Sequence, residues 1–321
     1  MKVVITDYTF DNLDIETKML EPAGCQVVGQ KIGRDPQQLI PLVKDADCVI
    51  TQFAPVNAEV IGAMQKCKII VRYGIGVDNV DLKAAAAKNI PVCNVPDYCI
   101  DEVADHTLAM ILDLTRKITV NAAKVKADGW GLAEPITALF AMKDITVGVV
   151  GFGRIGREVA IRLKAFKCKI LVFDPVVDAS TAQSAGVTAV SLDELLRASD
   201  LVTLHCPSNE KTQYMINAKS IATMKPGAML VNTSRGTLVR TDDLVAALQN
   251  GHISAAALDV TDPEPIPPNH PLVKMNNVII TAHYASASPR AVETLRRGVA
   301  NVVAIALRGQ KLPNVVNGVG V

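Results

Sequence analysis

The chain has no excess of charge, no basic block, no Cys-x-x-Cys pair and no apolar run long enough to span a membrane. Its 33 basic and 32 acidic residues leave a net charge of +1, which argues against nucleic acid or an anionic membrane surface as its partner. The N-terminus carries one lysine and passes directly into a β-like run, so no signal peptide is expected. We therefore expect a cytoplasmic protein.

The seven cysteines are scattered singly, and several lie inside apolar runs. Their spacing is unlike that of metal ligands, so we predict no metal site. An odd number of cysteines in a chain without a secretion signal indicates reduced thiols. Hydrophobic residues make up 49% and charged residues 20%, which is the balance of a folded protein.

Short β-branched runs alternate with helical stretches along most of the chain, a pattern typical of parallel α/β sheets. The 321 residues exceed one ordinary core, so two domains are expected. A long helix is predicted over 101–118 and a final helix from Ser288-Pro289 to about Arg308. Strands are predicted over 3–7, 25–29, 47–51, 68–72, 91–95, 145–150, 169–173, 200–205, 228–232, 255–260 and 277–281.

The segment "VGVVGFGRIGREVA" (147–160) places three glycines between a predicted strand and a predicted helix. In a dinucleotide-binding turn, Gly151 permits the tight turn, Gly153 lets the backbone approach the pyrophosphate, and Gly156 allows close helix–strand packing. Asp174 ends the next strand, where a carboxylate accepts hydrogen bonds from ribose hydroxyls and repels a 2′-phosphate. The sequence therefore predicts binding of NAD(H) rather than NADP(H).

Three polar segments follow strands of the second half, where the ligand cleft of a parallel sheet opens. They are "VNTSRGTLV" (231–239), "ALDVTDPEPIP" (257–267) and "ITAHYASAS" (280–288). Together with the glycine loop and "YGIGVDNVDL" (73–82), they resemble the D-isomer-specific 2-hydroxyacid dehydrogenase family. The resemblance covers nearly the whole chain, and the combination of motifs is highly specific.

The resemblance implies an α/β fold of two Rossmann-like, doubly wound parallel-sheet domains with the active-site cleft between them. The substrate domain is then formed by both chain ends, 1–101 and 288–321, and the NAD-binding domain by 102–287. Members of the family are usually dimers, with the long linking helix and its neighbours at the interface. A homodimer is therefore expected.

Position by position, the resemblance makes Arg235 the residue that binds the substrate carboxylate, Glu264 the partner of the catalytic histidine, and His283 the proton donor and acceptor. A planar guanidinium can hold a carboxylate and a 2-oxo group together. Oxidation of a hydroxyl to a ketone releases a hydride and a proton, and histidine handles the proton near neutral pH. A neighbouring carboxylate favours the imidazolium that keto-acid reduction needs.

Further cofactor contacts are implied by the same resemblance. They are Arg154 and Ile155 at the pyrophosphate, Cys206 and Pro207 beside the adenosine, and Thr233 with its neighbour Ser234, Asp259 and Ala285 around the nicotinamide.

For the substrate, two glycines flank Ile75, and the family match places backbone donors for a carboxylate at Ile75 and Gly76. Gln52 and Arg72 are additional candidate contacts.

The chain departs from the family pattern at several positions. The loop "TQFAPVN" (51–57) contains no cation, and Arg72 alone suits a distal phosphate, which normally takes more than one positive partner. An unphosphorylated substrate is therefore favoured over 3-phosphoglycerate. Two other departures lie elsewhere: Ala282 stands where most relatives have proline, and "TALFAMKD" (137–144) lacks the usual arginine.

These observations predict an NAD-dependent D-2-hydroxyacid dehydrogenase, or 2-keto acid reductase, that exchanges a hydride between the nicotinamide and C2 of a small substrate. Two alternatives stay open: an NAD(H)-sensing binding protein similar to the corepressors of the family, and a 3-phosphoglycerate dehydrogenase. Formate oxidation fits poorly, because that branch has glutamine where this chain has Glu264.

Overall fold

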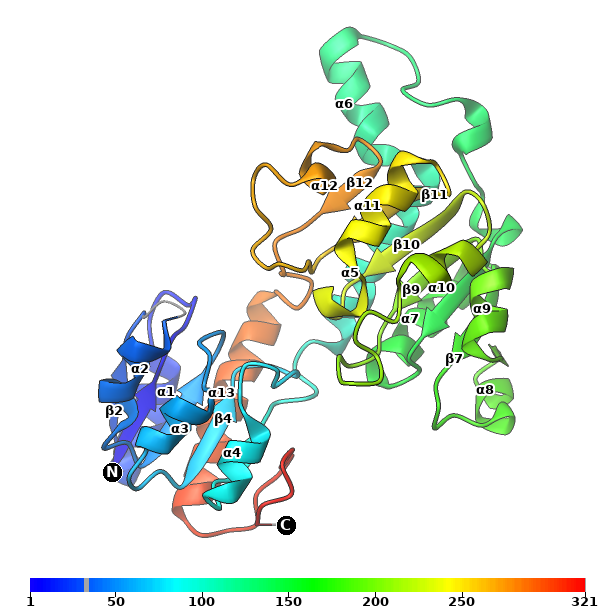
Figure 1. Cartoon of the computed structure of the whole chain (residues 1–321). Coiled ribbons are helices and arrows are strands. Elements are labelled where there is room, and N and C mark those ends of the chain that lie inside the picture. Colours follow the sequence, from blue (N-terminus) through cyan, green and yellow to red (C-terminus); the bar gives the residue numbers. More distant parts are fainter. Residues whose placement is uncertain (32–34, 321) are drawn as a thin grey trace. The chain divides into compact units, whose positions relative to one another are not determined.

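The computed structural model describes residues 1–31 and 35–320 and divides the chain into two compact units. Unit 1 comprises Met1–Tyr98 and Ser288–Val321, and unit 2 comprises Cys99–Ala287. Each unit is built on a parallel β-sheet (Figure 1), so the predicted fold class of two parallel-sheet α/β domains is confirmed. The assignment of substrate binding to unit 1 stays a prediction.

Unit 1 contains a five-stranded sheet with the order β2-β1-β3-β4-β5. Its register pairs Ile5 with Ile50 and Thr51 with Arg72, so the carboxyl ends of β1, β3 and β4 lie side by side. The strands are β1 (Lys2–Ile5), β2 (Gln26–Gly29), β3 (Cys48–Thr51), β4 (Ile69–Arg72) and β5 (Val92–Cys93).

Helices cover both faces of this sheet because its strands are apolar on both sides. α2 and α3 contribute to the core on one face, and α1 and α13 to the core on the other. The Ser288 side chain accepts a hydrogen bond from the N–H of Ala291 and so caps α13 as predicted. The helices are α1 (Asp14–Leu20), η1 (Glu21–Ala23), α2 (Pro36–Val43), α3 (Ala58–Ala63), α4 (Leu82–Ala87) and α13 (Pro289–Leu307).

Unit 2 contains a seven-stranded sheet with the order β12-β11-β10-β9-β6-β7-β8. The chain moves from β6 to β7 and β8 on one side, then returns to β9 on the other side, so the strand order reverses beside β6. The strands are β6 (Thr146–Val150), β7 (Lys169–Phe173), β8 (Thr188–Ala189), β9 (Leu201–Leu204), β10 (Ala228–Asn232), β11 (Ile253–Leu258) and β12 (Val278–Ile280).

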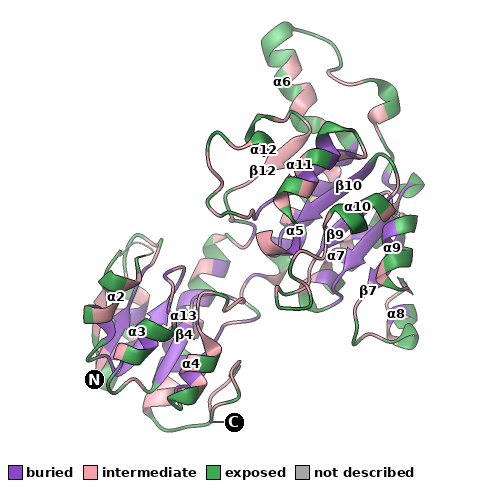
Figure 2. Cartoon of the chain, in the orientation of Figure 1, coloured by how far each residue is buried: buried purple, intermediate pink, exposed green. Residues whose placement is uncertain are grey.

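The unit 2 sheet is buried between two layers of helices, and Figure 2 shows its central strands as buried. α5 and α7 pack on the face that contains Val147 and Val149, and α9, α10 and α11 pack on the opposite face. The helices are α5 (Ile100–Arg116), α6 (Ile118–Asp128), η2 (Ile136–Ala138), η3 (Met142–Asp144), α7 (Arg154–Ala165), α8 (Ala179–Ser184), α9 (Leu192–Ala198), α10 (Ala218–Thr223), η4 (Gly236–Leu238), α11 (Thr241–Gln249) and α12 (Pro271–Lys274).

The predicted helix over 101–118 is interrupted at Lys117, whose φ of 54° ends α5 and allows α6 to begin. α6 itself has no buried residue, so it packs no apolar face against the core, which is the feature from which a helix is usually predicted. None of the helices in the described ranges combines the length and apolar character that a membrane span requires.

Candidate active site

The glycine loop joins β6 to α7 where the strand order of unit 2 reverses. Gly151 has a φ of 93°, and a Cβ atom built on it would lie 2.6 Å from the backbone nitrogen of Cys206. A Cβ atom on Gly156 would lie 2.1 Å from the carbonyl oxygen of Gly151. The loop, the helix and the end of β9 therefore pack together only because these two residues have no side chain.

Gly153 has the opposite environment, since no described atom lies within 4 Å of a Cβ built there. Gly153 is also the N-cap of α7 and provides no side-chain hydrogen bond to the first turn. Arg154 and Ile155 open that turn, where backbone N–H groups have no partner within the helix. This surface fits the pyrophosphate of a dinucleotide, because exposed N–H groups and the helix dipole both favour an anion.

Asp174 follows β7 and is fixed beside the glycine loop. One carboxylate oxygen accepts the N–H of Phe152 at 2.8 Å, and the other accepts the N–H of Val176 at 3.0 Å. Each carboxylate oxygen can accept a second hydrogen bond. The half-buried carboxylate thus retains capacity for the ribose hydroxyls that the sequence assigns to it.

The loop after β9 contains an uncharged histidine and thiol. The imidazole Nε2 of His205 lies 2.9 Å from the hydroxyl of Thr203, and burial lowers the pKa of His205 to about 3. Burial raises the pKa of the neighbouring Cys206 thiol to about 11. Neither group changes its protonation near neutral pH, so neither serves as the proton donor. Pro207, the other predicted adenosine contact, is exposed.

Arg235 lies in the loop after β10, and a buried asparagine fixes its backbone. Asn232, 1% exposed, donates to the carbonyl oxygen of Arg235 at 2.8 Å and accepts the N–H of Ser234 at 3.0 Å. The Ser234 hydroxyl donates to the carbonyl oxygen of Leu204 at the end of β9. The half-buried guanidinium of Arg235 donates to the Ser234 carbonyl at 2.7 Å. Asn232 was not among the site residues predicted from the sequence.

The Arg235 loop packs directly against the loop that carries Glu264. A Cβ atom on Gly236 would lie only 2.0 Å from the carbonyl oxygen of Thr261. The absence of a side chain at Gly236 therefore leaves the space in which the loops after β10 and β11 contact each other.

The structure pairs Glu264 with His283. The imidazole Nδ1 lies 2.8 Å from a carboxylate oxygen of Glu264, and the two side chains are 29% and 30% exposed. A carboxylate at this distance orients the ring. Glu264 thus engages Nδ1, and Nε2 is the other nitrogen of the ring.

A buried aspartate holds the turn on which His283 lies. The Asp259 carboxylate, 2% exposed, accepts the N–H groups of Tyr284 at 3.0 Å and Ala285 at 2.9 Å. Its carbonyl oxygen accepts the N–H of His283 at 2.9 Å. His283 has a φ of 53°, a left-handed conformation that these three bonds stabilise.

α5 also reaches this group of loops through residues that sequence reasoning missed. The hydroxyl of Thr107 lies 2.8 Å from that of Thr233, a predicted nicotinamide contact. The imidazole Nε2 of His106 lies 3.2 Å from the hydroxyl of Thr281, which in turn donates to Asp259 at 2.6 Å. Within the sequence, His106 and Thr107 are simply polar positions of a helix, and only the packing of α5 on the sheet reveals these contacts.

All these groups lie at the carboxyl edge of one parallel sheet. Its strand order gives their order along the edge: His283 after β12, Glu264 after β11, Arg235 after β10, Cys206 after β9, the glycine loop after β6 and Asp174 after β7. The predicted acid–base pair and the predicted dinucleotide loop therefore lie on the same edge, with β10 and β9 between them. The dinucleotide loop is beside the point of strand reversal at which ligands bind in such sheets.

The other predicted substrate residues belong to unit 1. Arg72 ends β4, and a Cβ atom on Gly74 would overlap its guanidinium, which lies 5.8 Å from the ring centroid of Phe53. Ile75 and Gly76 are half-buried, and the carbonyl oxygen of Ile75 accepts from Asn94 at 2.6 Å. Gln52 is buried beyond the end of β3.

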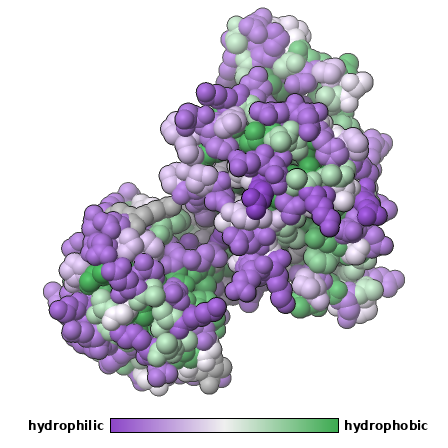
Figure 3. Space-filling view, in the orientation of Figure 1, coloured by the Kyte–Doolittle hydropathy of each residue, from purple (hydrophilic) through white to green (hydrophobic). Residues whose placement is uncertain are grey.

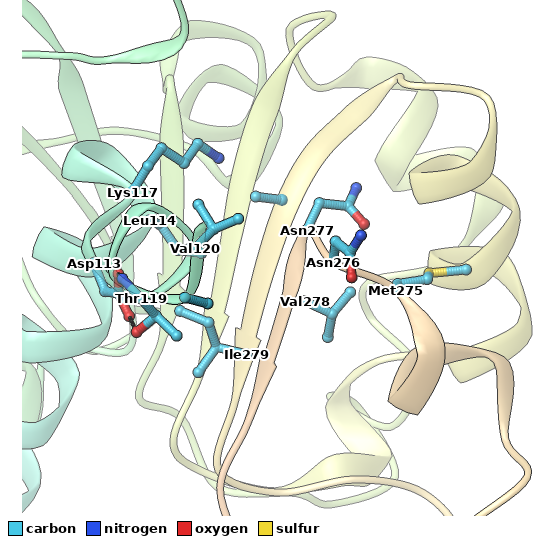
Figure 4. Close-up of a pocket in the computed structure, with 12 residues that line it drawn as sticks. Asp113, Leu114, Lys117, Thr119, Val120, Met275, Asn276, Asn277, Val278 and Ile279 are labelled. Atoms are coloured by element: carbon cyan, nitrogen blue, oxygen red, sulfur yellow. Dashed lines mark hydrogen bonds between the residues drawn. The ribbon is translucent and has the colours of Figure 1, made fainter. Parts of the chain in front are cut away.

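A pocket of about 270 Å³ lies elsewhere in unit 2, between the α5–α6 turn and β12. Figure 4 shows Leu114, Lys117 and Val120 on one side of it and Val278 with Ile279 on the other. Asn276 and Asn277, which precede β12, also line it, whereas His283 follows that strand. This pocket is therefore at the opposite end of β12 from the candidate active site.

Comparison with known proteins agrees with this geometry. Residues 108–285, just over half of the chain, match the family model described as "D-isomer specific 2-hydroxyacid dehydrogenase, NAD binding domain". The predicted NAD cofactor and the predicted family are thus confirmed.

Two curated relatives are similar to most of the chain. A D-3-phosphoglycerate dehydrogenase of Mycobacterium leprae is 37% identical over 287 residues, which are 89% of this chain and 54% of that protein. A glyoxylate reductase of Korarchaeum cryptofilum is 38% identical over 282 residues, 87% of this chain and 85% of that protein. The chain thus spans about half the length of the phosphoglycerate dehydrogenase and most of the reductase.

Among solved structures, a D-lactate dehydrogenase of Aquifex aeolicus, complexed with NAD and lactic acid, has a TM-score of 0.87 and 29% sequence identity. The similarity covers 96% of each chain. With its NAD-binding domain at residues 108–285, this chain belongs to the D-isomer specific 2-hydroxyacid dehydrogenase family.

Proposed function

We propose that the chain is an NAD-dependent D-2-hydroxyacid dehydrogenase that works on a small, unphosphorylated 2-hydroxy or 2-keto acid. The observation that carries the proposal is the 2.8 Å pair of His283 and Glu264 on the same sheet edge as Arg235 and the glycine loop. Such a pair is suited to moving one proton, which is the task that hydride exchange leaves to the protein.

Bound NAD(H) supplies or takes up the hydride exchanged at C2. In keto-acid reduction, Nε2 of His283 gives a proton to the carbonyl oxygen, and in the reverse direction it takes the proton from the hydroxyl. The Glu264 carboxylate beside Nδ1 keeps the ring oriented. Arg235 binds the carboxylate and the 2-oxo group.

An unphosphorylated substrate is supported by the loop 51–57, which contains neither lysine nor arginine. It is also supported by relatives named glyoxylate reductase, of whose length the chain covers about 85%. The relatives named D-3-phosphoglycerate dehydrogenase keep that activity as the second candidate. Arg72, at the end of β4, is the cation predicted to suit a distal phosphate.

The test is NADH oxidation with a panel of glyoxylate, hydroxypyruvate, pyruvate, phenylpyruvate and 3-phosphohydroxypyruvate. We expect turnover with an unphosphorylated member, and a loss on the order of 10³-fold in the His283→Ala variant with unchanged NADH affinity. Preference for the phosphorylated member would establish the second candidate. NADH binding without turnover of any member would instead favour a dinucleotide sensor, and wild-type activity of His283→Ala would contradict the assigned role of this histidine.

We further propose a homodimer formed through α6 and the segment that follows it. In Figure 1 this part extends away from the rest of unit 2, and Figure 3 shows hydrophobic residues among hydrophilic ones over it. Such exposed apolar side chains are characteristic of an interaction surface. They are Ile118, Val125, Trp130, Leu132, Ile136 and Phe140, with exposures of 37 to 98%. Light scattering should give twice the chain mass of 34.2 kDa, and the mass of one chain would refute the dimer.

A cytoplasmic location is proposed as well. It is supported by the seven cysteines, all of which are free thiols and several of which are buried in the cores. Reduced thiols are the usual state of cysteine in that compartment.

A further inference from the structure

A buried carboxylate lies at the carboxyl edge of the unit 1 sheet, next to the loop that carries the predicted substrate residue Gln52. Asp7 is located two residues beyond the end of β1 and is 8% exposed. Because β1 pairs with β3 in parallel, Asp7 lies beside the residues that follow Thr51. Those residues form the start of the loop 52–57.

Asp7 binds three successive backbone N–H groups of this loop. One carboxylate oxygen accepts the N–H of Gln52 at 2.9 Å, and the other accepts those of Phe53 at 2.7 Å and Ala54 at 3.1 Å. The Thr6 hydroxyl also donates to the first oxygen at 2.9 Å. These backbone groups follow the last residue of β3, so the carboxylate replaces the partners that a sheet would provide.

Gln52 provides a second link within the same edge. Its carboxamide oxygen accepts the N–H of Thr9 at 2.8 Å, and its carboxamide nitrogen donates to the Thr9 hydroxyl at 3.1 Å. The side chain is 7% exposed. Both ends of the carboxamide are thus engaged by the β1–α1 loop, which suits a residue that joins two loops better than one that contacts a substrate.

We propose that Asp7 and Gln52 are positioning residues of the substrate site. They fix the loop 52–54 to the β1–α1 loop, and they thereby determine the positions of the Phe53 and Arg72 side chains. Phe53 is half-buried, with the Arg72 guanidinium 5.8 Å from its ring centroid. Fixing the loop before binding removes the entropy cost of ordering it when the substrate arrives. This inference rests on the proposed dehydrogenase function and deepens it, since it changes the role of Gln52 from substrate contact to support.

The first experiment uses the Asp7→Asn variant. Each carboxylate oxygen of Asp7 accepts at least one backbone N–H group of the loop. Whichever oxygen is replaced by the NH₂ group of asparagine, at least one of these N–H groups loses its acceptor. We expect the KM for the 2-keto acid to rise about tenfold or more, with an unchanged Kd for NADH. A purely structural role would instead lower the stability and leave the KM for the keto acid unchanged.

Asp47→Asn is the matched control. Asp47 is also buried, at 9% exposure, and its carboxylate likewise accepts a backbone N–H, that of Lys2 at 2.7 Å. It precedes β3, however, and so lies at the opposite edge of the same sheet. Its variant should lose stability without a change in the KM for the keto acid. An equal rise in KM in both variants, or none in Asp7→Asn, would overturn the proposal.

The second experiment separates support from contact at Gln52. If Gln52 acts through Thr9, then Gln52→Leu raises the KM for pyruvate and for hydroxypyruvate by the same factor, and Thr9→Val shifts both in the same direction. If Gln52 binds a substrate hydroxyl, only the KM for hydroxypyruvate rises, which would overturn the positioning role.

These outcomes are distinct from a failure of the proposed function. If the wild-type protein turns over no keto acid while binding NADH, the proposed function fails and the inference fails with it. If the wild type is active and the variants behave as their controls, only the inference fails.

Discussion

Replacing Gly236 with alanine tests the contact that joins the Arg235 loop to the Glu264 loop. The added methyl group would lie 2.0 Å from the carbonyl oxygen of Thr261, whereas ordinary van der Waals contact begins at 3.4 Å. One loop therefore has to move by about 1.4 Å, the difference between these distances. Since the obstructing atom is backbone, it cannot rotate away. A displacement of about 1 Å in an active site costs on the order of 100-fold in rate, or about 2.7 kcal/mol of activation free energy.

We therefore expect kcat/KM for the keto acid to fall on the order of 100-fold in Gly236→Ala. The Kd for NADH, measured by fluorescence titration, should change less than kcat/KM, because the glycine loop and Asp174 follow other strands of the sheet. Gly62→Ala is the control, since nothing lies within 4 Å of a Cβ at that position in α3. Wild-type kcat/KM in Gly236→Ala would refute the reasoning, and so would a parallel loss of NADH binding, which would indicate a general disruption of unit 2.

Two further predictions concern the cofactor edge. Asp174→Asn keeps an acceptor for only one of the N–H groups of Phe152 and Val176, and it removes the charge that repels a 2′-phosphate. The preference for NADH over NADPH should therefore narrow about tenfold in fluorescence titrations, and an unchanged preference would place discrimination elsewhere. Burial lowers the pKa of His205 to about 3, whereas the unfolded chain binds a proton at this residue below about 6.5. Stability is therefore lost as the pH falls through 6.5 towards 3, and His205→Asn should lose roughly 2 kcal/mol less than the wild type between pH 7 and pH 5. Urea unfolding at the two pH values measures this, and parallel losses would argue against a buried neutral imidazole.

The sequence predicted the elements that have a strong local pattern. Apolar β-branched runs located the strands, because a parallel strand is buried on both faces. Ser288-Pro289 identified the start of α13, since a side-chain cap is a local interaction. The glycine loop was recognisable for a similar reason: its strand, its turn and its helix are consecutive in the chain.

α6 was missed because it packs no apolar face against the core, which is the feature that usually reveals a helix, and its start depends on the left-handed Lys117. Asn232 and Asp7 were missed for another reason. A buried polar residue at a strand end is visible in the sequence only as one polar letter, and its partners come from other segments. Gln52 was predicted as a candidate substrate contact, but its two bonds to Thr9 could not be foreseen, because Thr9 lies in a distant segment of the chain.

By itself, the sequence determined the class of fold, the dinucleotide loop and the set of residues that identify the family, because each depends on residue types at fixed spacings. Only the tertiary structure decided which side chains meet. The 2.8 Å pair of His283 and Glu264, and the contact of Gly236 with Thr261, join segments on different strands. Such contacts depend on strand order, register and the space left by missing side chains, none of which is a local property of the chain.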